Sequence, residues 1–154
     1  MPAKKNHSIS VYLNQDYPSI VKSDGIYLYD DTGKRYVDAS SGPILCSLGY
    51  GNEKIADVLK KQTLKASYVF RMDFTTPELE ECCARICEKT DGVMDRVFLV
   101  SGGSEATEIA IKLARSYQID SGNPSKFKVI SRWLSYHGST MGSLALSGFP
   151  YRRA

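Results

Sequence analysis

A turn of small residues at 101–104 is the first candidate for chemistry in this chain. It stands between an apolar run, residues 97–100, and the start of a helical pattern. Backbone N–H groups at a helix N-terminus have no intrahelical partner, and the peptide dipoles place a partial positive charge there. Glycine at positions 102 and 103 leaves that backbone open to a ligand. The order of strand, glycine turn and helix therefore predicts a site for an anionic group, a phosphate above all.

A second loop carries an aromatic residue and a histidine, Tyr136 and His137, followed by Gly138. It comes after residues 127–130, which are typical of a strand, just as the glycine turn comes after residues 97–100. Ligands of doubly wound sheets lie beyond the carboxyl ends of the strands, where both loops are expected. An aromatic ring near a phosphate site favours a ligand with a flat, partly apolar body.

Neither loop is specific by itself. Most glycine turns before helices bind nothing, and this one lacks the G-x-x-x-x-G-K-[ST] and G-x-G-x-x-G patterns of common nucleotide sites. Tyr136 could equally be a half-buried packing residue, and His137 could serve only to hydrogen-bond neighbouring backbone. The electrostatics of a helix start explain Glu105 and Glu108. Glu108 also stands four residues before Lys112, which predicts a favourable ion pair on the helix.

The N-terminal part of the chain is expected to form a hairpin, a loop and a helix. Residues 25–29 and 34–38 predict two short strands, and the Asp-Asp-Thr-Gly between them predicts a hairpin turn. The stretch up to about residue 24 indicates an irregular or short helical lead-in. A loop rich in glycine, serine and proline covers residues 39–51, and a helix is expected from Asn52.

The fold class that these patterns favour is α/β, with residues 1–74 as an N-terminal segment and residues 75–154 as the beginning of a parallel-sheet domain. A capping pattern at residues 75–78 starts a helix that buries one apolar face and ends near Gly92. The apolar strand, amphipathic helix and second strand within residues 97–131 predict a β-α-β unit, parallel and right-handed.

Composition narrows the possible partners. The chain has 154 residues and a net charge of +3, from 20 basic and 17 acidic side chains, which gives no argument for nucleic acid or an anionic membrane. No apolar run approaches the roughly 20 residues that cross a bilayer. The lysines near the N-terminus are not followed by the apolar segment that a secretory signal would have. The four cysteines form no C-x-x-C pair, which disfavours a disulfide framework or a metal site and favours a cytoplasmic protein.

Four segments together resemble the class III aminotransferases, which bind pyridoxal phosphate (PLP) in the type I fold. The order and spacing of the segments make the resemblance specific, and it covers nearly the whole chain from about residue 20 onward. It implies that this chain is the N-terminal part of such an α/β fold, with the hairpin segment and the start of the cofactor domain. The segments are GIYLYDDTGKRYVDASSG (25–42), LGYGN (48–52), SGGSEATEIAIKLAR (101–115) and SYHGSTMG (135–142).

The resemblance implies a cofactor site on both loops. Gly103 and Ser104 would contact the PLP phosphate through backbone N–H groups and the hydroxyl, and Tyr136 would stack on the pyridine ring. His137 and Gly138 would shape the pocket beside that ring. No metal is implied.

The resemblance also implies a substrate entrance and a homodimer with shared active sites. The loop 41–46, with Ile44 and Leu45, would line the entrance to the site of the neighbouring subunit. Family members often carry an aromatic residue where this chain has Ile44, which leaves substrate size and preference open. The substrates would be an amine or amino acid as donor and a keto acid or aldehyde as acceptor.

The family's reaction needs a lysine that forms a Schiff base with PLP and an acidic residue beside the pyridine nitrogen. Family members carry both well after the YHG segment, and no lysine of this chain stands in a matching context. We therefore expect an N-terminal portion of an aminotransferase, inactive by itself and with uncovered apolar surface. Two alternatives stay open: another enzyme of the group, an aminomutase or decarboxylase, or a catalytically inactive fragment or dimerisation module.

Overall fold

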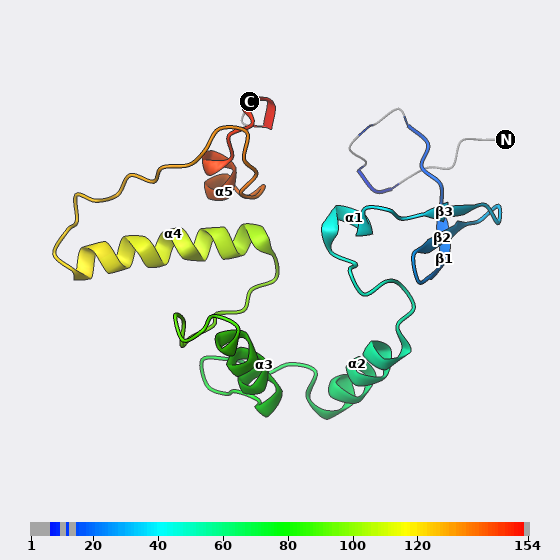
Figure 1. Cartoon of the computed structure of the whole chain (residues 1–154), viewed down its shortest axis with the longest axis horizontal. Coiled ribbons are helices and arrows are strands. Elements are labelled where there is room, and N and C mark those ends of the chain that lie inside the picture. Colours follow the sequence, from blue (N-terminus) through cyan, green and yellow to red (C-terminus); the bar gives the residue numbers. More distant parts are fainter. Residues whose placement is uncertain (1–6, 10–11, 13–14, 153–154) are drawn as a thin grey trace. The chain divides into compact units, whose positions relative to one another are not determined.

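A computed structural model of the chain describes residues 7–9, 12 and 15–152. Contacts divide the chain into two compact units, residues 1–74 and residues 75–154. Within the described residues, the first unit holds a small antiparallel sheet and two helices, and the second holds three α-helices and a short 3-10 helix (Figure 1).

Three antiparallel strands form the sheet of the first unit, in the order β1-β2-β3. The pair β2 (Tyr27–Asp30) and β3 (Arg35–Val37) confirms the predicted hairpin. Strand β1 (Ile20–Asp24) pairs with β2 and corrects the expectation of an irregular or helical lead-in. In its sequence, IVKSD, apolar and polar residues do not alternate, so the period-two pattern that predicts a strand is weak there. The pairing register with β2 also shifts between Ile20 and Lys22.

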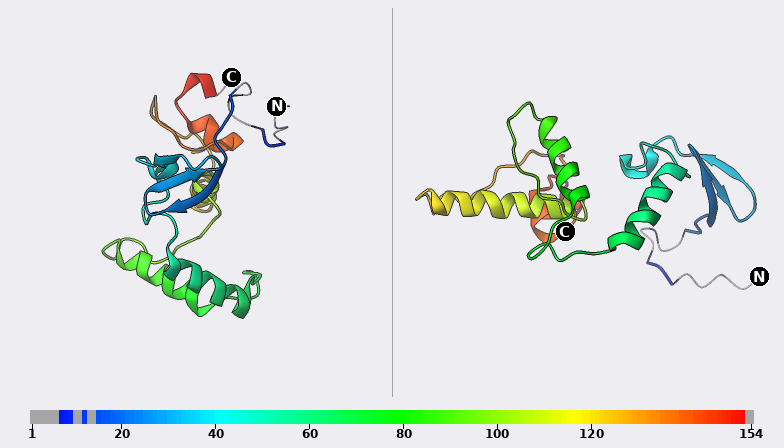
Figure 2. Two further views of the ribbon diagram at one scale, coloured as in Figure 1. Left: turned by 90° about the vertical axis from the view of Figure 1, so that its right-hand side faces the viewer. Right: turned by 90° about the horizontal axis from the view of Figure 1, so that it is seen from below.

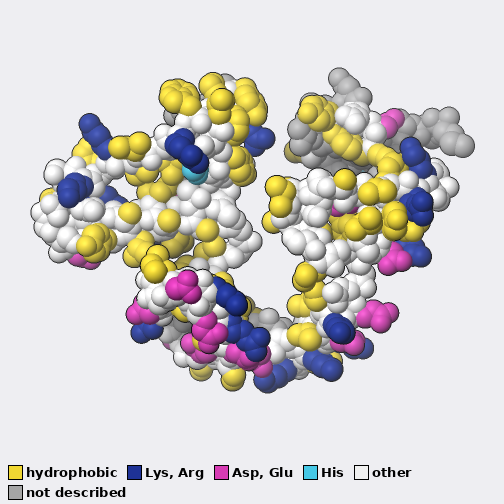
Figure 3. Space-filling model, viewed as in Figure 1, with side chains coloured by type: hydrophobic (Ala, Val, Ile, Leu, Met, Phe, Trp, Pro, Cys, Tyr) yellow, Lys and Arg dark blue, Asp and Glu magenta, His cyan; other side chains and the backbone are white. Residues whose placement is uncertain are grey.

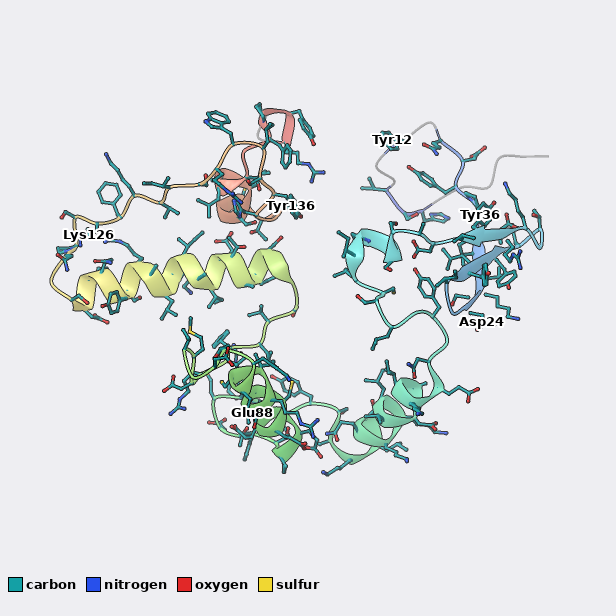
Figure 4. The ribbon with its side chains drawn as sticks, viewed as in Figure 1. Tyr12, Asp24, Tyr36, Glu88, Lys126 and Tyr136 are labelled. Atoms are coloured by element: carbon teal, nitrogen blue, oxygen red, sulfur yellow. The ribbon has the colours of Figure 1, made fainter. Side chains whose placement is uncertain are left out.

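Asp30 organises the turn between β2 and β3. Its carboxylate accepts hydrogen bonds from the Thr32 hydroxyl at 2.6 Å and the Tyr36 hydroxyl at 2.7 Å (Tyr36 is labelled in Figure 4). The backbone N–H of Lys34 donates to the same group at 3.0 Å. These donors, the Thr32 hydroxyl foremost, lower the pKa of the buried Asp30 to about 2. Gly33, at φ +85°, supplies the left-handed backbone that the turn requires.

Two helices follow the sheet in the first unit. The short α1 (Ser41–Ile44) is kinked, with non-helical backbone angles at Gly42 and Pro43. The longer α2 (Glu53–Ala66) begins where the sequence predicted it, because the Asn52 side chain accepts a hydrogen bond from the N–H of Ile55 at 3.2 Å.

The second unit begins with α3 (Pro77–Glu88), whose N-cap residue is Thr76. The Thr76 hydroxyl accepts from the N–H of Leu79 at 3.2 Å, whereas Thr75 donates to the Glu80 carboxylate at 2.6 Å. The helix was therefore predicted correctly, and the residue that caps it is the second of the two threonines.

Helix α5 (Met141–Leu146) lies beside the first turns of α4 (Gly103–Asp120), as Figures 1 and 2 both show. Helix α4 confirms the amphipathic helix predicted after the glycine turn. Helix α5 was not predicted from the sequence. A 3-10 turn, Pro150–Arg152, follows it.

The prediction of strands at residues 97–100 and 127–130 is wrong. Neither segment is a strand, and the sheet of the described residues is the antiparallel one of the first unit. An apolar run indicates that a segment suits a buried position. To form a strand, the segment also needs a neighbouring strand to which its backbone is hydrogen-bonded. Consecutive segments of a doubly wound sheet need not be neighbours, so one β-α-β sequence does not by itself form a ladder.

Among the described residues, no apolar side chain is buried. The buried polar side chains among them are Asp30, Ser143 and Ser147. Figure 3 shows apolar side chains at the surface over the sheet and over the second unit, as expected for uncovered helix faces. The predicted buried face of α3 is wrong for this structure, because no residue of the helix is buried and the helices beside which it would pack do not cover it; Cys83 is half-buried and Cys82 exposed. No helix among the described residues is both long and apolar enough to cross a membrane.

Candidate cofactor site

Helix α4 begins at the glycine turn that the sequence singled out. Gly102 is its N-cap residue, extended at φ −168° and ψ 173°, and makes no side-chain cap. The first helical hydrogen bond joins Ala106 N to Gly102 O at 3.0 Å. The N–H groups of residues 103–105 therefore have no acceptor inside the helix, and the dipoles of an 18-residue helix add partial positive charge at this end.

The space beside this turn is open on one side. No atom lies within 4 Å of the position that a Cβ would take on Gly103. On Gly102 the same position lies 2.9 Å from a carboxylate oxygen of Glu105, so the acid covers that side of the turn. An anion that binds the backbone N–H groups would therefore approach beside Gly103 and Ser104.

Ser104 joins the glycine turn to the second loop. Its hydroxyl oxygen accepts a hydrogen bond from Ser139 N at 3.0 Å. Gly138 lies against it, because a Cβ there would be 2.7 Å from Ser104 Oγ and closer still to the Ser143 side chain. At φ +133°, Gly138 also has a backbone conformation that other residues rarely adopt. The loop thus requires glycine at position 138 for packing as well as for backbone geometry.

Thr107 provides a second link between helix and loop, one that the sequence analysis missed. Its hydroxyl donates to the carbonyl oxygen of His137 at 2.9 Å, and the carbonyl oxygen of Gly103 lies 3.1 Å away. A β-branched hydroxyl residue is a poor choice for a helix unless its oxygen finds a partner. Because Thr107 also has this ordinary partner four residues earlier in its own helix, the sequence holds no signal that would have revealed the contact to His137.

Tyr136 and His137 have different surroundings in the loop. The Tyr136 side chain is 55% exposed, and its hydroxyl lies 3.0 Å from Ser139 Oγ (Figure 4). The guanidinium of Arg152 lies 5.3 Å from the Tyr136 ring centroid. His137 donates its backbone N–H to Ser147 Oγ at 3.0 Å, whereas its ring Nε2 is buried without a hydrogen-bond partner. Such a buried atom is uncommon and marks a place where a bound group could supply the partner.

Glu108 contacts the region after the loop, against the expectation of an ion pair with Lys112. A single oxygen, Oε1, accepts from Thr140 Oγ1 at 2.7 Å, from Gly142 N at 2.9 Å and from Ser143 N at 3.2 Å. The Thr140 hydroxyl is the foremost of the donors that lower the pKa of Glu108. The charge of this side chain is therefore directed at the start of α5.

The two expected substrate residues, Ile44 and Leu45, lie in the first unit and are both exposed, Ile44 by 82%. Ile44 has φ +66°, which is strained for a β-branched residue. Asp38 holds this loop, because it accepts from Gly42 N at 2.8 Å and from the Tyr50 hydroxyl at 2.6 Å. The hydrogen bond from Tyr50 is the main cause that lowers the pKa of Asp38, and it raises the pKa of Tyr50.

The five expected cofactor residues therefore lie together in the second unit, on the start of α4 and the loop beside it. The sequence pattern of one family, Aminotransferase class-III, matches residues 12–153 of this chain. The chain belongs to the class-III aminotransferases. It spans about a third of the length of the curated relatives it matches, with 33% covered in the first of them.

This class-III chain is similar to several aminotransferases. It is 38% identical over 148 residues to the uncharacterized aminotransferase YodT of Bacillus subtilis, covering 96% of this chain and 33% of that protein. An (S)-enantioselective omega-transaminase from Thermomicrobium roseum is 30% identical with a TM-score of 0.90, over 96% of this chain and 34% of that one. An amine transaminase from an uncultivated Pseudomonas species, solved in its PLP-bound form, is 27% identical with a TM-score of 0.86, over 94% and 33%. The fold is therefore that of the N-terminal part of a PLP transaminase.

Proposed function

We propose that the complete protein is a PLP-dependent aminotransferase that moves an amino group between an amine or amino acid and a keto acid or aldehyde. The observation that carries the proposal is the direct connection between the start of α4 and the loop at Tyr136. Hydrogen bonds from Ser139 to Ser104 and from Thr107 to His137 join the start of α4, whose backbone N–H groups suit a phosphate, to the loop that carries the exposed Tyr136 ring. The chain is proposed to act as a homodimer in the cytoplasm, where its free cysteines would stay reduced.

The chemistry of the site fits PLP. The open side of Gly103 and the N–H groups of the first turn of α4 suit a phosphate. Ser104 Oγ already accepts from Ser139 N, so its own proton is available for a phosphate oxygen. The exposed Tyr136 ring suits a flat heteroaromatic body, and the buried Nε2 of His137 lacks the partner that a polar ring substituent could supply.

Each residue of the candidate site has a distinct role in this proposal. Gly103 and Ser104 would bind the phosphate, Tyr136 would lie against the ring, and Gly138 would allow the loop to pack on the helix start. PLP, when bound, supplies an electron sink for bonds at the carbon that carries the amino group. The residues of this chain would bind and orient it, whereas the lysine that the reaction requires has no matching position in this sequence.

The loop at Ile44 is proposed to contact substrate at the entrance of a neighbouring subunit's site. Its support is the exposure of Ile44 and Leu45 together with the strained backbone at Ile44. Asp38 fixes the neighbouring part of this loop, because it accepts from Gly42 N and from the Tyr50 hydroxyl.

The test is PLP affinity of the protein expressed from its complete reading frame. PLP is titrated and bound cofactor is followed by absorbance for the wild type, Ser104→Ala and Tyr136→Ala. We expect each substitution to weaken PLP binding by about tenfold, because each removes a contact to the cofactor. The controls Ser125→Ala and Tyr68→Ala, at exposed positions outside the site, should bind as the wild type does. Wild-type affinity in both site variants would contradict the assignment.

A further inference from the structure

The carboxylate of Glu108 holds the first turn of α5 from outside that helix. Thr140 is the N-cap residue of α5, yet its hydroxyl donates to Glu108 Oε1 at 2.7 Å. The N–H groups of Gly142 and Ser143, which an N-cap side chain would ordinarily satisfy, also donate to Glu108 Oε1, at 2.9 and 3.2 Å. Thr140 and Ser143 also form a capping box, in which each side chain accepts from the backbone N–H of the other, so the residue of α4 adds to the helix's own cap.

The packing around this contact leaves little freedom. A Cβ on Gly142 would lie 2.7 Å from Glu108 Oε1 and nearer still to the other carboxylate oxygen. The Ser143 side chain is fully buried. The carboxylate therefore reaches the backbone of α5 only because position 142 is glycine, and α5 can take one position relative to α4 while the contact is made.

Helix α5 in turn carries the loop of Tyr136. Ser147, just after α5, accepts from His137 N at 3.0 Å, and its hydroxyl lies 3.1 Å from Ser143 O. Ser143 Oγ accepts from Thr140 N at 3.1 Å. The loop is thus anchored at both ends to α5, so a shift of α5 along α4 would move Tyr136 relative to the start of α4.

We propose that Glu108 is a positioning residue: by holding α5 on α4, it sets where Tyr136 stands relative to the Gly103–Ser104 turn. The inference rests on the proposed PLP site and adds a residue that touches neither phosphate nor ring. A carboxylate is suited to this task because one oxygen can accept several hydrogen bonds from donors at a helix N-terminus. Glutamine keeps the carbonyl oxygen and the length of the side chain, so it should replace glutamate in part, whereas alanine should not.

The experiment uses the protein expressed from its complete reading frame, loaded with PLP, as wild type, Glu108→Ala and Glu108→Gln. We expect Glu108→Ala to weaken PLP binding by about tenfold or more and to change the circular dichroism of the bound cofactor, which reports the orientation of its ring. Glu108→Gln should recover most of both properties. Asp120→Ala, at the far end of the same helix, is the matched control and should resemble the wild type.

A substitution on α5 keeps the test decisive if Glu108→Ala folds poorly. Gly142→Ala retains every side chain of the contact but pushes the carboxylate away, so it should reproduce the weaker binding and the changed dichroism. Wild-type PLP affinity and wild-type dichroism in Gly142→Ala would overturn the proposal.

Amide hydrogen exchange separates failure of this inference from failure of the proposed function. In Glu108→Ala without cofactor, amide exchange at Gly142 should become faster, since its acceptor is lost. If the wild type binds no PLP, the proposed function fails. If the wild type binds PLP and exchange rises in Glu108→Ala, but affinity and dichroism stay those of the wild type, the positioning role alone is overturned.

Discussion

The hydroxyl of Thr107 donates a hydrogen bond of 2.9 Å to the carbonyl oxygen of His137, joining α4 to the loop that follows residues 127–130. The two residues stand 30 positions apart in the sequence. With the bond from Ser139 to Ser104, this contact places two short motifs, each unspecific by itself, at one site.

Replacing Thr107 by valine removes the hydroxyl and keeps the shape of the side chain. We expect the free energy of unfolding to fall by about 1 kcal/mol, because the His137 carbonyl loses its donor, and PLP affinity to fall with it. Urea denaturation and PLP titration of the complete protein measure both. The control is Thr63→Val, which removes a hydroxyl bonded only within its own helix, to Leu59 O at 2.8 Å. Equal effects at both positions would argue against a special role for Thr107.

Gly138→Ala should be far more harmful than Gly122→Ala, although both glycines have positive φ, +133° and +76°. A Cβ at Gly122 meets nothing within 4 Å, so that change should cost only the backbone strain, about 1 kcal/mol. A Cβ at Gly138 would collide with Ser143 and with Ser104 Oγ, which adds overpacking of about 1–3 kcal/mol. Thermal unfolding and PLP retention during dialysis compare the two variants. Retention by Gly138→Ala equal to that of Gly122→Ala would contradict this packing.

The hairpin of the first unit should lose stability in acid. The pKa of Asp30 is lowered to about 2 in the folded state, below the roughly 3.9 of an unfolded aspartate. Its stabilising contribution is therefore complete above about pH 4 and is lost as the pH falls toward about 2. Carbon-13 NMR of the Asp30 carboxyl group should show the low pKa, and Asp30→Asn should remove this part of the pH dependence. A titration near pH 4 would show that the Thr32 and Tyr36 bonds do not form.

Enlarging the side chain at Ile44 should change substrate preference without changing cofactor binding. We expect Ile44→Phe to alter the ratio of kcat/KM values for small and bulky amino donors by several-fold, because we propose that this exposed residue contacts substrate rather than PLP. PLP affinity should stay that of the wild type. Val58→Phe, on the exposed surface of α2, is the matched control. An unchanged ratio in Ile44→Phe would remove this loop from the substrate site.

The elements with strong local signals could be predicted from the sequence. Asn52 and the two threonines before Pro77 mark helix starts, the glycine turn marks the start of α4, and the Asp-Asp-Thr-Gly turn marks the hairpin. Each signal acts within a few residues, through a cap or a left-handed turn, and needs no knowledge of distant contacts.

The remaining features depend on contacts between distant residues. Strand β1 exists because β2 offers it a partner, whereas the apolar run at residues 97–100 predicts a buried segment and leaves its neighbour unspecified. Glu108 looks like an ordinary acid of a helix start, and only the placement of α5 shows that it reaches Gly142. The resemblance predicted the cofactor residues, but the contacts that join these residues became visible only in the structure.

The most direct test of the central claim is a crystal structure of the complete protein with PLP bound. We predict the phosphate at the Gly103–Ser104 turn, within hydrogen-bond distance of backbone N–H groups at the start of α4, and the pyridine ring against Tyr136. A cofactor whose phosphate lies away from that turn, or whose ring does not touch Tyr136, would contradict the account.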